Sequence, residues 1–178
     1  MGEPFRFPQL DDQTRALMLE EIDLEGEDLK RGVCVTPRGF EDYPSLLRDA
    51  ASSGTERDLM DALNQNDRIT TSPVNAAERL AGTEFNRFYV RAVCRKANKH
   101  GTNEVVVIRA RPSKNPRGAS EAIVGETRAA QTLRDVLRTS NGVGDALGVA
   151  DVNSGLSVRC GCDQCEADLG DVYPRRFS

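Results

Sequence analysis

A long amphipathic helix followed at once by a short apolar strand is the pattern that most limits how this chain can fold. Residues 76–100 follow the predicted cap Asn75, with Glu78 three residues after the cap as in a capping box. The segment carries apolar side chains at helical spacing. These are Ala77, Leu80, Ala81, Phe85, Phe88, Tyr89 and Ala92. Residues 104–110 contain four consecutive β-branched residues from Val105 to Ile108, which is typical of a strand buried on both faces. The succession predicts a long helix packed on a central strand.

The other predicted elements are shorter. Apolar spacing and turn residues predict helices over about residues 11–22, 40–50, 55–64 and 128–138, strands over about 29–35 and 156–159, and a loop over 113–127. We therefore expect an α+β, or mixed α/β, fold. Its small sheet has the buried central strand 104–110 and is packed by the long helix 76–100 and by shorter helices.

The chain of 178 residues has the size of one ordinary domain with small additions. Residues 1–10 alternate proline and phenylalanine in a segment too short to fold alone, so we expect an extended N-terminal arm. Residues 11–159 are predicted to form a single globular α/β domain. Residues 160–178 are predicted to be a cysteine-containing C-terminal appendage.

The formal net charge of −4 conceals an asymmetry along the chain. Residues 1–67 carry 16 acidic and 7 basic side chains, residues 68–138 carry 6 and 14, and residues 139–178 carry 6 and 3. The basic side chains of the long helix lie mostly opposite its apolar stripe: Arg87, Arg91, Arg95, Lys96 and Lys99. Such segregation either compensates within the chain or serves contacts with copies of it and with charged partners, and both alternatives stay open.

The sequence predicts neither a membrane span nor a secretory signal. The sequence has no run of about 18 apolar residues, so we expect no membrane span. The first residues lack a basic segment followed by an apolar one, so we expect no secretory signal and synthesis in a reducing cytoplasm.

The most specific chemical feature is a cluster of three thiols in six residues, Cys160, Cys162 and Cys165. A structural zinc ion takes four ligands, so these three thiols need one partner. The candidates for that partner are Cys34, Cys94, His100, Asp163 and Glu166.

Two alternatives to zinc stay open. The thiols can form disulfides within the chain or between subunits, with Cys34 as a further candidate, since five cysteines leave at least one over. They can also be free thiols without a role. The cofactor prediction is accordingly either none or one structural zinc ion, held by Cys160, Cys162 and Cys165.

A basic cluster follows the central strand. Arg109 and Arg111 share one parity at the strand end, so we expect them to point the same way, and Lys114 and Arg117 follow in the loop. Four cations there suit a phosphate, a nucleic acid or an acidic protein surface. The alternative is that they are solubilising groups. Since no aromatic residue is interleaved, stacking on bases is unsupported.

No complete catalytic signature is present: the sequence has no G-x-S-x-G, P-loop or G-x-G-x-x-G motif. His100 is the only histidine and stands at the end of the long helix, where a cation is favourable, so we interpret it as a helix cap. We interpret Glu121 and Glu126 as loop carboxylates that pair with the arginines. We therefore expect a protein without enzymatic activity.

Five phrases occur in order within residues 73–159. They are PVNAAE at 73–78, EFNRFYVR at 84–91, RARP at 109–112, NPR with SE at 115–117 and 120–121, and NSGLSVR at 153–159. Together they resemble a family of small proteins of bacteria and tailed phages. The resemblance implies no established activity and no catalytic residue. It also implies that the chain tends to end soon after the last phrase, which would make residues 160–178 an addition with its own function.

These observations favour a non-enzymatic structural or interaction protein. The first interpretation is a subunit of a phage particle, in the head, neck or tail junction, assembled in the host cytoplasm. It would contact copies of itself, other particle proteins and DNA, while its thiols crosslink or pin subunits. The alternative is a small zinc-stabilised protein of the bacterial cytoplasm that binds nucleic acid through the basic cluster. A third interpretation is an enzyme that uses Glu121 and the arginines on a phosphorylated or nucleotide substrate.

Overall fold

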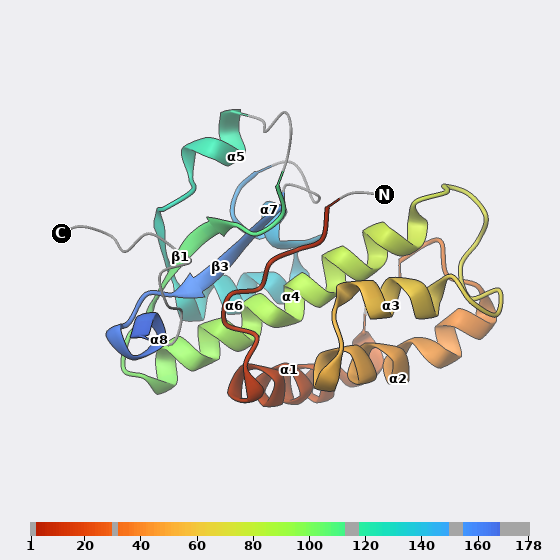
Figure 1. Ribbon diagram of the computed structural model, residues 1–178, viewed down its shortest axis with the longest axis horizontal. Coiled ribbons are helices and arrows are strands. Elements are labelled where there is room, and N and C mark those ends of the chain that lie inside the picture. Colours follow the sequence, from red (N-terminus) through yellow and green to blue (C-terminus); the bar gives the residue numbers. More distant parts are fainter. Residues whose placement is uncertain (1–2, 30–31, 113–117, 150–154, 168–178) are drawn as a thin grey trace.

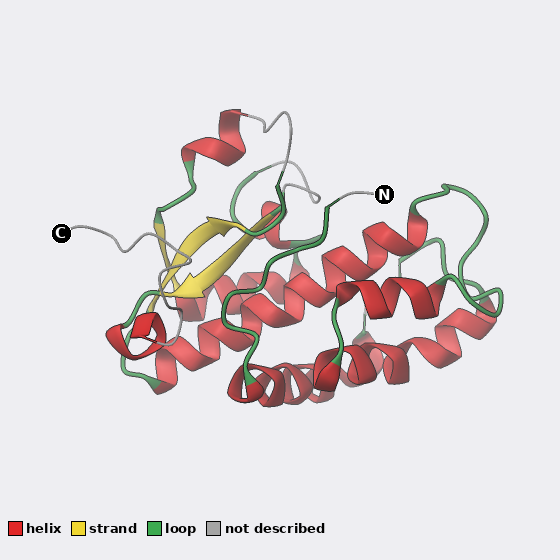
Figure 2. Cartoon of the chain, viewed as in Figure 1, coloured by secondary structure: helices red, strands yellow, loops and turns green. Residues whose placement is uncertain are grey.

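The computed structural model describes residues 3–29, 32–112, 118–149 and 155–167 (Figure 1). Its elements are α1 (Asp12–Glu25), η1 (Gly26–Asp28), α2 (Pro37–Ser53), α3 (Glu56–Leu63), α4 (Ala76–Lys99), β1 (Glu104–Arg109), α5 (Gly118–Ala122), β2 (Thr127–Ala129), α6 (Ala130–Thr139), α7 (Val143–Ala146), β3 (Leu156–Cys160) and α8 (Asp163–Ala167). Figure 2 shows a mainly helical molecule with one small sheet. The predicted α+β class is confirmed.

Helix α4 is the centre of the fold. It contacts α1, α3, α6, β1 and β3, so its apolar stripe is enclosed (Figure 1). Phe85, Phe88 and Tyr89 are each at most 1% exposed. The predicted cap differs in detail, because the side chain of Asn75 makes no capping hydrogen bond. The burial of α4 on several sides explains why its small and aromatic residues can pack a single core around it.

The sheet has the order β2-β1-β3, and both pairings are antiparallel. Val107 lies opposite Val158 in the β1–β3 register. The four residues Val105–Ile108 are all buried, as predicted for a central strand. Every residue of β3 is buried as well, although β3 is an edge strand of the sheet, and the strand contacts α4.

The N-terminal residues 3–10 run across α4 and form neither helix nor strand. Phe7 packs on Phe85 and Tyr89, with ring centroids 5.2 and 4.7 Å apart. The Arg6 N–H donates to the Ala110 carbonyl oxygen at 2.7 Å, just after β1. This segment, which we call the arm, therefore joins the helical side of the molecule to the sheet.

Two predicted segments differ from the structure. Of the predicted strand 29–35, the described part contains a turn at Gly32, with a φ of +70°, and one isolated bridge from Val35 to Ile69. The positive φ interrupts an extended backbone, so no ladder forms there. The predicted loop 113–127 contains α5 and the start of β2, because the chain folds back and the Val107 N–H donates to the Glu126 carbonyl oxygen.

The cysteine-containing end is joined to the rest of the domain. Cys160 is the last residue of β3, and Cys165, in α8, is 1% exposed within the main hydrophobic core. The start of the segment predicted as an appendage is thus packed with residues 11–159, while residues 168–178 lie outside the described part of the chain.

Candidate metal centre

Three elements meet at one end of α4 (Figure 1). His100 is the C-terminal cap of α4, and Gly101, with a φ of +77°, turns the chain toward β1. β3 pairs antiparallel with β1, so its last residue, Cys160, lies beside the start of β1 and the end of α4. Cys162 follows in the turn, and Cys165 lies in α8. The topology alone thus brings one histidine and three cysteines together.

The four side chains converge on one point. The Cys160 thiol donates to the Cys162 sulfur at 3.2 Å, and His100 Nδ1 lies 3.4 Å from Cys162 Sγ and 3.2 Å from Cys165 Sγ. All four potential ligand atoms lie within 4.8 Å of one another. Zinc–sulfur bonds of about 2.3 Å in a tetrahedron place neighbouring sulfurs about 3.8 Å apart. The cluster therefore has the size and the donor set of a Cys₃His zinc site.

The surroundings of the thiols differ from one to the next. Burial raises the pKa of Cys160 and of Cys165 above the usual thiol range. Burial opposes ionisation of Cys162 as well, but hydrogen bonds from the Cys165 backbone, the Cys160 thiol and His100 lower its pKa to about 7. A bound cation would favour the thiolate at every one of these positions. The site therefore holds one thiol ready to ionise and two that need a positive charge.

The structure selects one of the candidate fourth ligands. The cluster includes His100 and does not include Cys34, Cys94, Asp163 or Glu166. Cys34 lies between η1 and α2, where its carbonyl oxygen accepts from the Thr70 N–H. Cys94 is enclosed within α4, and burial raises its pKa. His100 does cap α4, as predicted, and its ring also faces the thiols, as expected of one of the candidate fourth ligands.

All five cysteines are free thiols in the structure. Cys160 and Cys165 are at most 1% exposed, so the disulfide candidates of the cluster face one another rather than a neighbouring molecule. This arrangement favours the metal alternative over crosslinks between subunits. It confirms the cysteine cluster as a unit and adds His100 to it.

The basic strand end is less available than its sequence indicates. Arg109 Nε lies 2.6 Å from a carboxylate oxygen of Glu121, and Arg111 pairs with Glu78. The two arginines thus contact different elements, α5 and α4. The predicted pairing of Glu121 with an arginine is confirmed, and Glu126 pairs with Arg128 at 2.7 Å.

Lys114 and Arg117, the remaining members of the predicted anion site, lie outside the described residues. With Arg109 and Arg111 each beside a carboxylate, the described half of the basic cluster carries little net charge.

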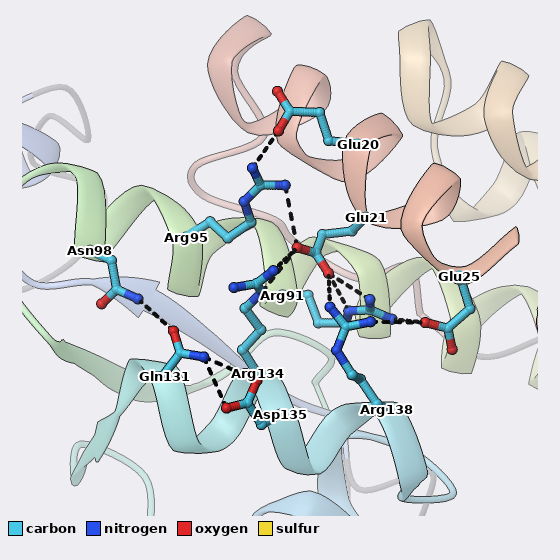
Figure 3. Close-up of polar contacts among 10 residues, drawn as sticks. All are labelled: Glu20, Glu21, Glu25, Arg91, Arg95, Asn98, Gln131, Arg134, Asp135 and Arg138. Carbon is cyan, nitrogen blue, oxygen red and sulfur yellow. Dashed lines mark hydrogen bonds and ion pairs between the residues drawn. The ribbon is translucent and has the colours of Figure 1, made fainter.

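A second polar cluster, on the side of α4 that faces α1 and α6, was not predicted. Glu21 of α1 is fully buried and meets four arginines: Arg91, Arg95, Arg134 and Arg138 (Figure 3). Glu25 adds a carboxylate 2.7 Å from Arg91. We call this group the Glu21 cluster. Arg91 is itself fully buried, and Arg87 and Lys96 are at most 3% exposed, so basic side chains placed opposite the apolar stripe are also enclosed by the fold.

Comparison of the chain with protein-family models, curated proteins and solved structures finds no match.

Proposed function

We propose that this protein is a non-enzymatic interaction protein stabilised by one structural zinc ion. One observation carries the proposal: the ligand atoms of His100, Cys160, Cys162 and Cys165 lie within 4.8 Å of one another. Three sulfurs and one imidazole nitrogen are the soft donor set that zinc prefers in structural sites.

The site favours a structural rather than a catalytic ion. Catalytic zinc keeps an open position for water or substrate, whereas four protein ligands close the coordination sphere. Cys160 and Cys165 are almost fully buried, which leaves little access for a substrate. A zinc ion here would tie the end of α4 to β3 and α8. Because the ligands come from segments about 60 residues apart, such a link also restricts the unfolded chain.

The outer helices support a role in protein contacts. Exposed acidic side chains on α1, α2 and α3 outnumber exposed basic ones. The acidic set is Asp12, Glu20, Asp23, Glu41, Asp49, Asp58 and Asp61, and the basic set is Arg38, Arg48 and Arg57. This layer would repel nucleic acid and suit a basic protein neighbour.

The form of this role that we propose is a subunit of a phage particle, and the sequence resemblance to proteins of bacteria and tailed phages supports it. Its partners would be copies of the chain and other particle proteins. Contact with DNA is the weaker part of the proposal, because Arg109 and Arg111 already pair with carboxylates.

The metal content of the purified protein under reducing and non-reducing conditions tests the proposal. We expect one zinc ion per chain of 19.5 kDa, in native mass spectra as well as by elemental analysis. Cys165→Ser should lose the metal, whereas Cys34→Ser, a matched change outside the cluster, should retain it. Chains without stoichiometric zinc, or covalent oligomers that disappear on reduction, would contradict the metal centre. A zinc protein that stays monomeric at high concentration and binds no other protein would contradict the subunit role alone.

A further inference from the structure

The side-chain amide of Gln9 holds the backbone of one ligand of the metal centre at two points. Gln9 Nε2 donates to the Cys160 carbonyl oxygen at 3.0 Å, and the Cys160 N–H donates to Gln9 Oε1 at 2.7 Å. Gln9 is 4% exposed and Cys160 is fully buried. A single side chain thereby replaces the pair of hydrogen bonds that a neighbouring strand would supply to the edge of β3.

Gln9 is itself held firmly within the arm. Its N–H donates to the Tyr89 hydroxyl oxygen at 3.3 Å, on the central part of α4. Two residues earlier, Phe7 packs between the rings of Phe85 and Tyr89. The position of the Gln9 amide therefore depends on whether the whole arm lies in its place on α4.

The residue directly after the arm meets α4 beside the metal centre as well. Asp11 forms an ion pair with Lys96, whose side chain is 3% exposed. Lys96 lies one helical turn before His100. The arm and Asp11 together thus contact the two elements that supply His100 and Cys160, the last turn of α4 and the end of β3.

From these contacts we propose that Gln9 is a positioning residue of the metal centre, so that metal binding and seating of the arm are one coupled equilibrium. This inference rests on the proposed zinc site and deepens it. Gln9 touches no ligand atom of the metal. It fixes the peptide that carries the Cys160 sulfur, and the sulfur position follows from that peptide.

The coupling must act in both directions. If a seated arm raises the affinity for zinc, bound zinc raises the equilibrium constant for seating of the arm by the same factor. Partners that orient metal ligands from outside the coordination sphere change metal affinity by about 10- to 100-fold when they are removed. We expect Gln9 to act within that range.

The first test measures the zinc dissociation constant of the full chain by competition with a chelating dye. Gln9→Ala should weaken binding by about 10- to 100-fold while the stoichiometry stays at one. Gln13→Ala, an exposed glutamine on α1, is the matched control and should leave the constant unchanged. If Gln9 contributed to stability alone, Gln9→Ala would lower the free energy of unfolding of the zinc-free and zinc-bound forms equally. The zinc dissociation constant would then stay the same. An unchanged constant in Gln9→Ala overturns the proposal.

The second test needs no variant and so does not depend on the folding of Gln9→Ala. Arg6 is exposed, and trypsin can cleave after it once the arm leaves α4. Zinc added to the wild-type chain should slow this cleavage about 10- to 100-fold, as mass spectrometry of the released peptide would show. Equal rates with and without zinc overturn the coupling. A wild-type chain that takes up no zinc instead refutes the metal centre itself, and the inference with it.

Discussion

The Glu21 cluster and the metal centre both lie along α4, but they join it to its neighbours by different chemistry. The Glu21 cluster joins α1, α4 and α6 through opposite charges that the chain itself supplies. The metal centre joins α4, β3 and α8 through four donor atoms that do not pair with one another as opposite charges. One cluster is complete when the chain folds. The other, if it holds the proposed zinc ion, would be complete only with that cation, so the two ends of the fold should respond to different perturbations.

The Glu21 cluster is distinguished by the number of charged side chains that it joins as well as by their burial. Glu21 alone accepts from four arginines, and Arg91 shares its charge between Glu21 and Glu25 (Figure 3). Buried charges are costly when a partner is lost, because the remaining charge stays without water or counter-charge. The loss of the central carboxylate should therefore weigh more than the loss of any arginine.

The largest effect is expected from Glu21→Gln. The change leaves the fully buried Arg91 with Glu25 alone and should lower the free energy of unfolding by about 3–5 kcal/mol. Chemical denaturation with and without a zinc chelator measures it, and the loss should be the same in both. Glu20→Gln, which removes a half-exposed partner of Arg95, is the control and should cost less than about 1 kcal/mol. A loss for Glu21→Gln that vanished in chelator would break the contrast between the clusters.

The next effect should depend entirely on the metal. Wild-type protein at free zinc a thousand times the dissociation constant gains about 4 kcal/mol over the metal-free form. Cys162→Ser removes the half-buried one of the four proposed ligands, so the variant should lose that gain. In excess chelator, the unfolding curves of the two proteins should coincide. A difference that persisted in chelator would mean that Cys162 stabilises the fold by its packing and not through a metal.

The smallest effect concerns the ion pair of Asp11 and Lys96, next to the metal centre. Partial burial opposes ionisation of Asp11, but hydrogen bonds from Lys96 and from the Thr14 backbone keep its pKa below the usual 3.8. A carboxyl group whose pKa is lower in the folded state adds stability above its unfolded pKa. This contribution is lost as the pH falls through the folded pKa, that is, below 3.8.

Asp11→Asn keeps a capping side chain for α1 and removes the charge. Its melting temperature should lie slightly below that of the wild type near neutral pH, and the two should converge as the pH falls below 3.8. A constant difference at all pH values would assign the effect to the helix cap. The result would show how far an ion pair that is partly open to water differs from the enclosed Glu21 cluster.

The parts of the fold that could be predicted are those in which the pattern is local. Helix α4 and strand β1 were predicted from apolar spacing and from four β-branched residues, and both are confirmed. The orientation of the arginines on α4 was not predictable in the same way. Arg91 is buried because Glu21 meets it from 70 residues earlier in the chain, and no local pattern records that partner.

The metal centre was likewise predictable only in its local part. The spacing of Cys160, Cys162 and Cys165 showed that they belong together, because they lie on one turn of chain. The choice of His100 among the candidate partners depends on the β1–β3 pairing. Gln9 lies 151 residues from Cys160, and only the path of the arm across α4 brings it there. A glutamine in a short N-terminal segment carries no signal of such a role in the sequence.

Side-chain amides close both ends of the outer edge of β3. Gln9 occupies the peptide groups of Cys160, and Asn86 Nδ2 donates to the Leu156 carbonyl oxygen at 2.8 Å. An open strand edge is a template onto which another chain can add a strand. Since this edge is already occupied at its two ends, copies of the protein should not join by adding a strand beside β3. Contacts made by a copy on this side of the molecule would therefore be set by side-chain fit rather than by backbone pairing.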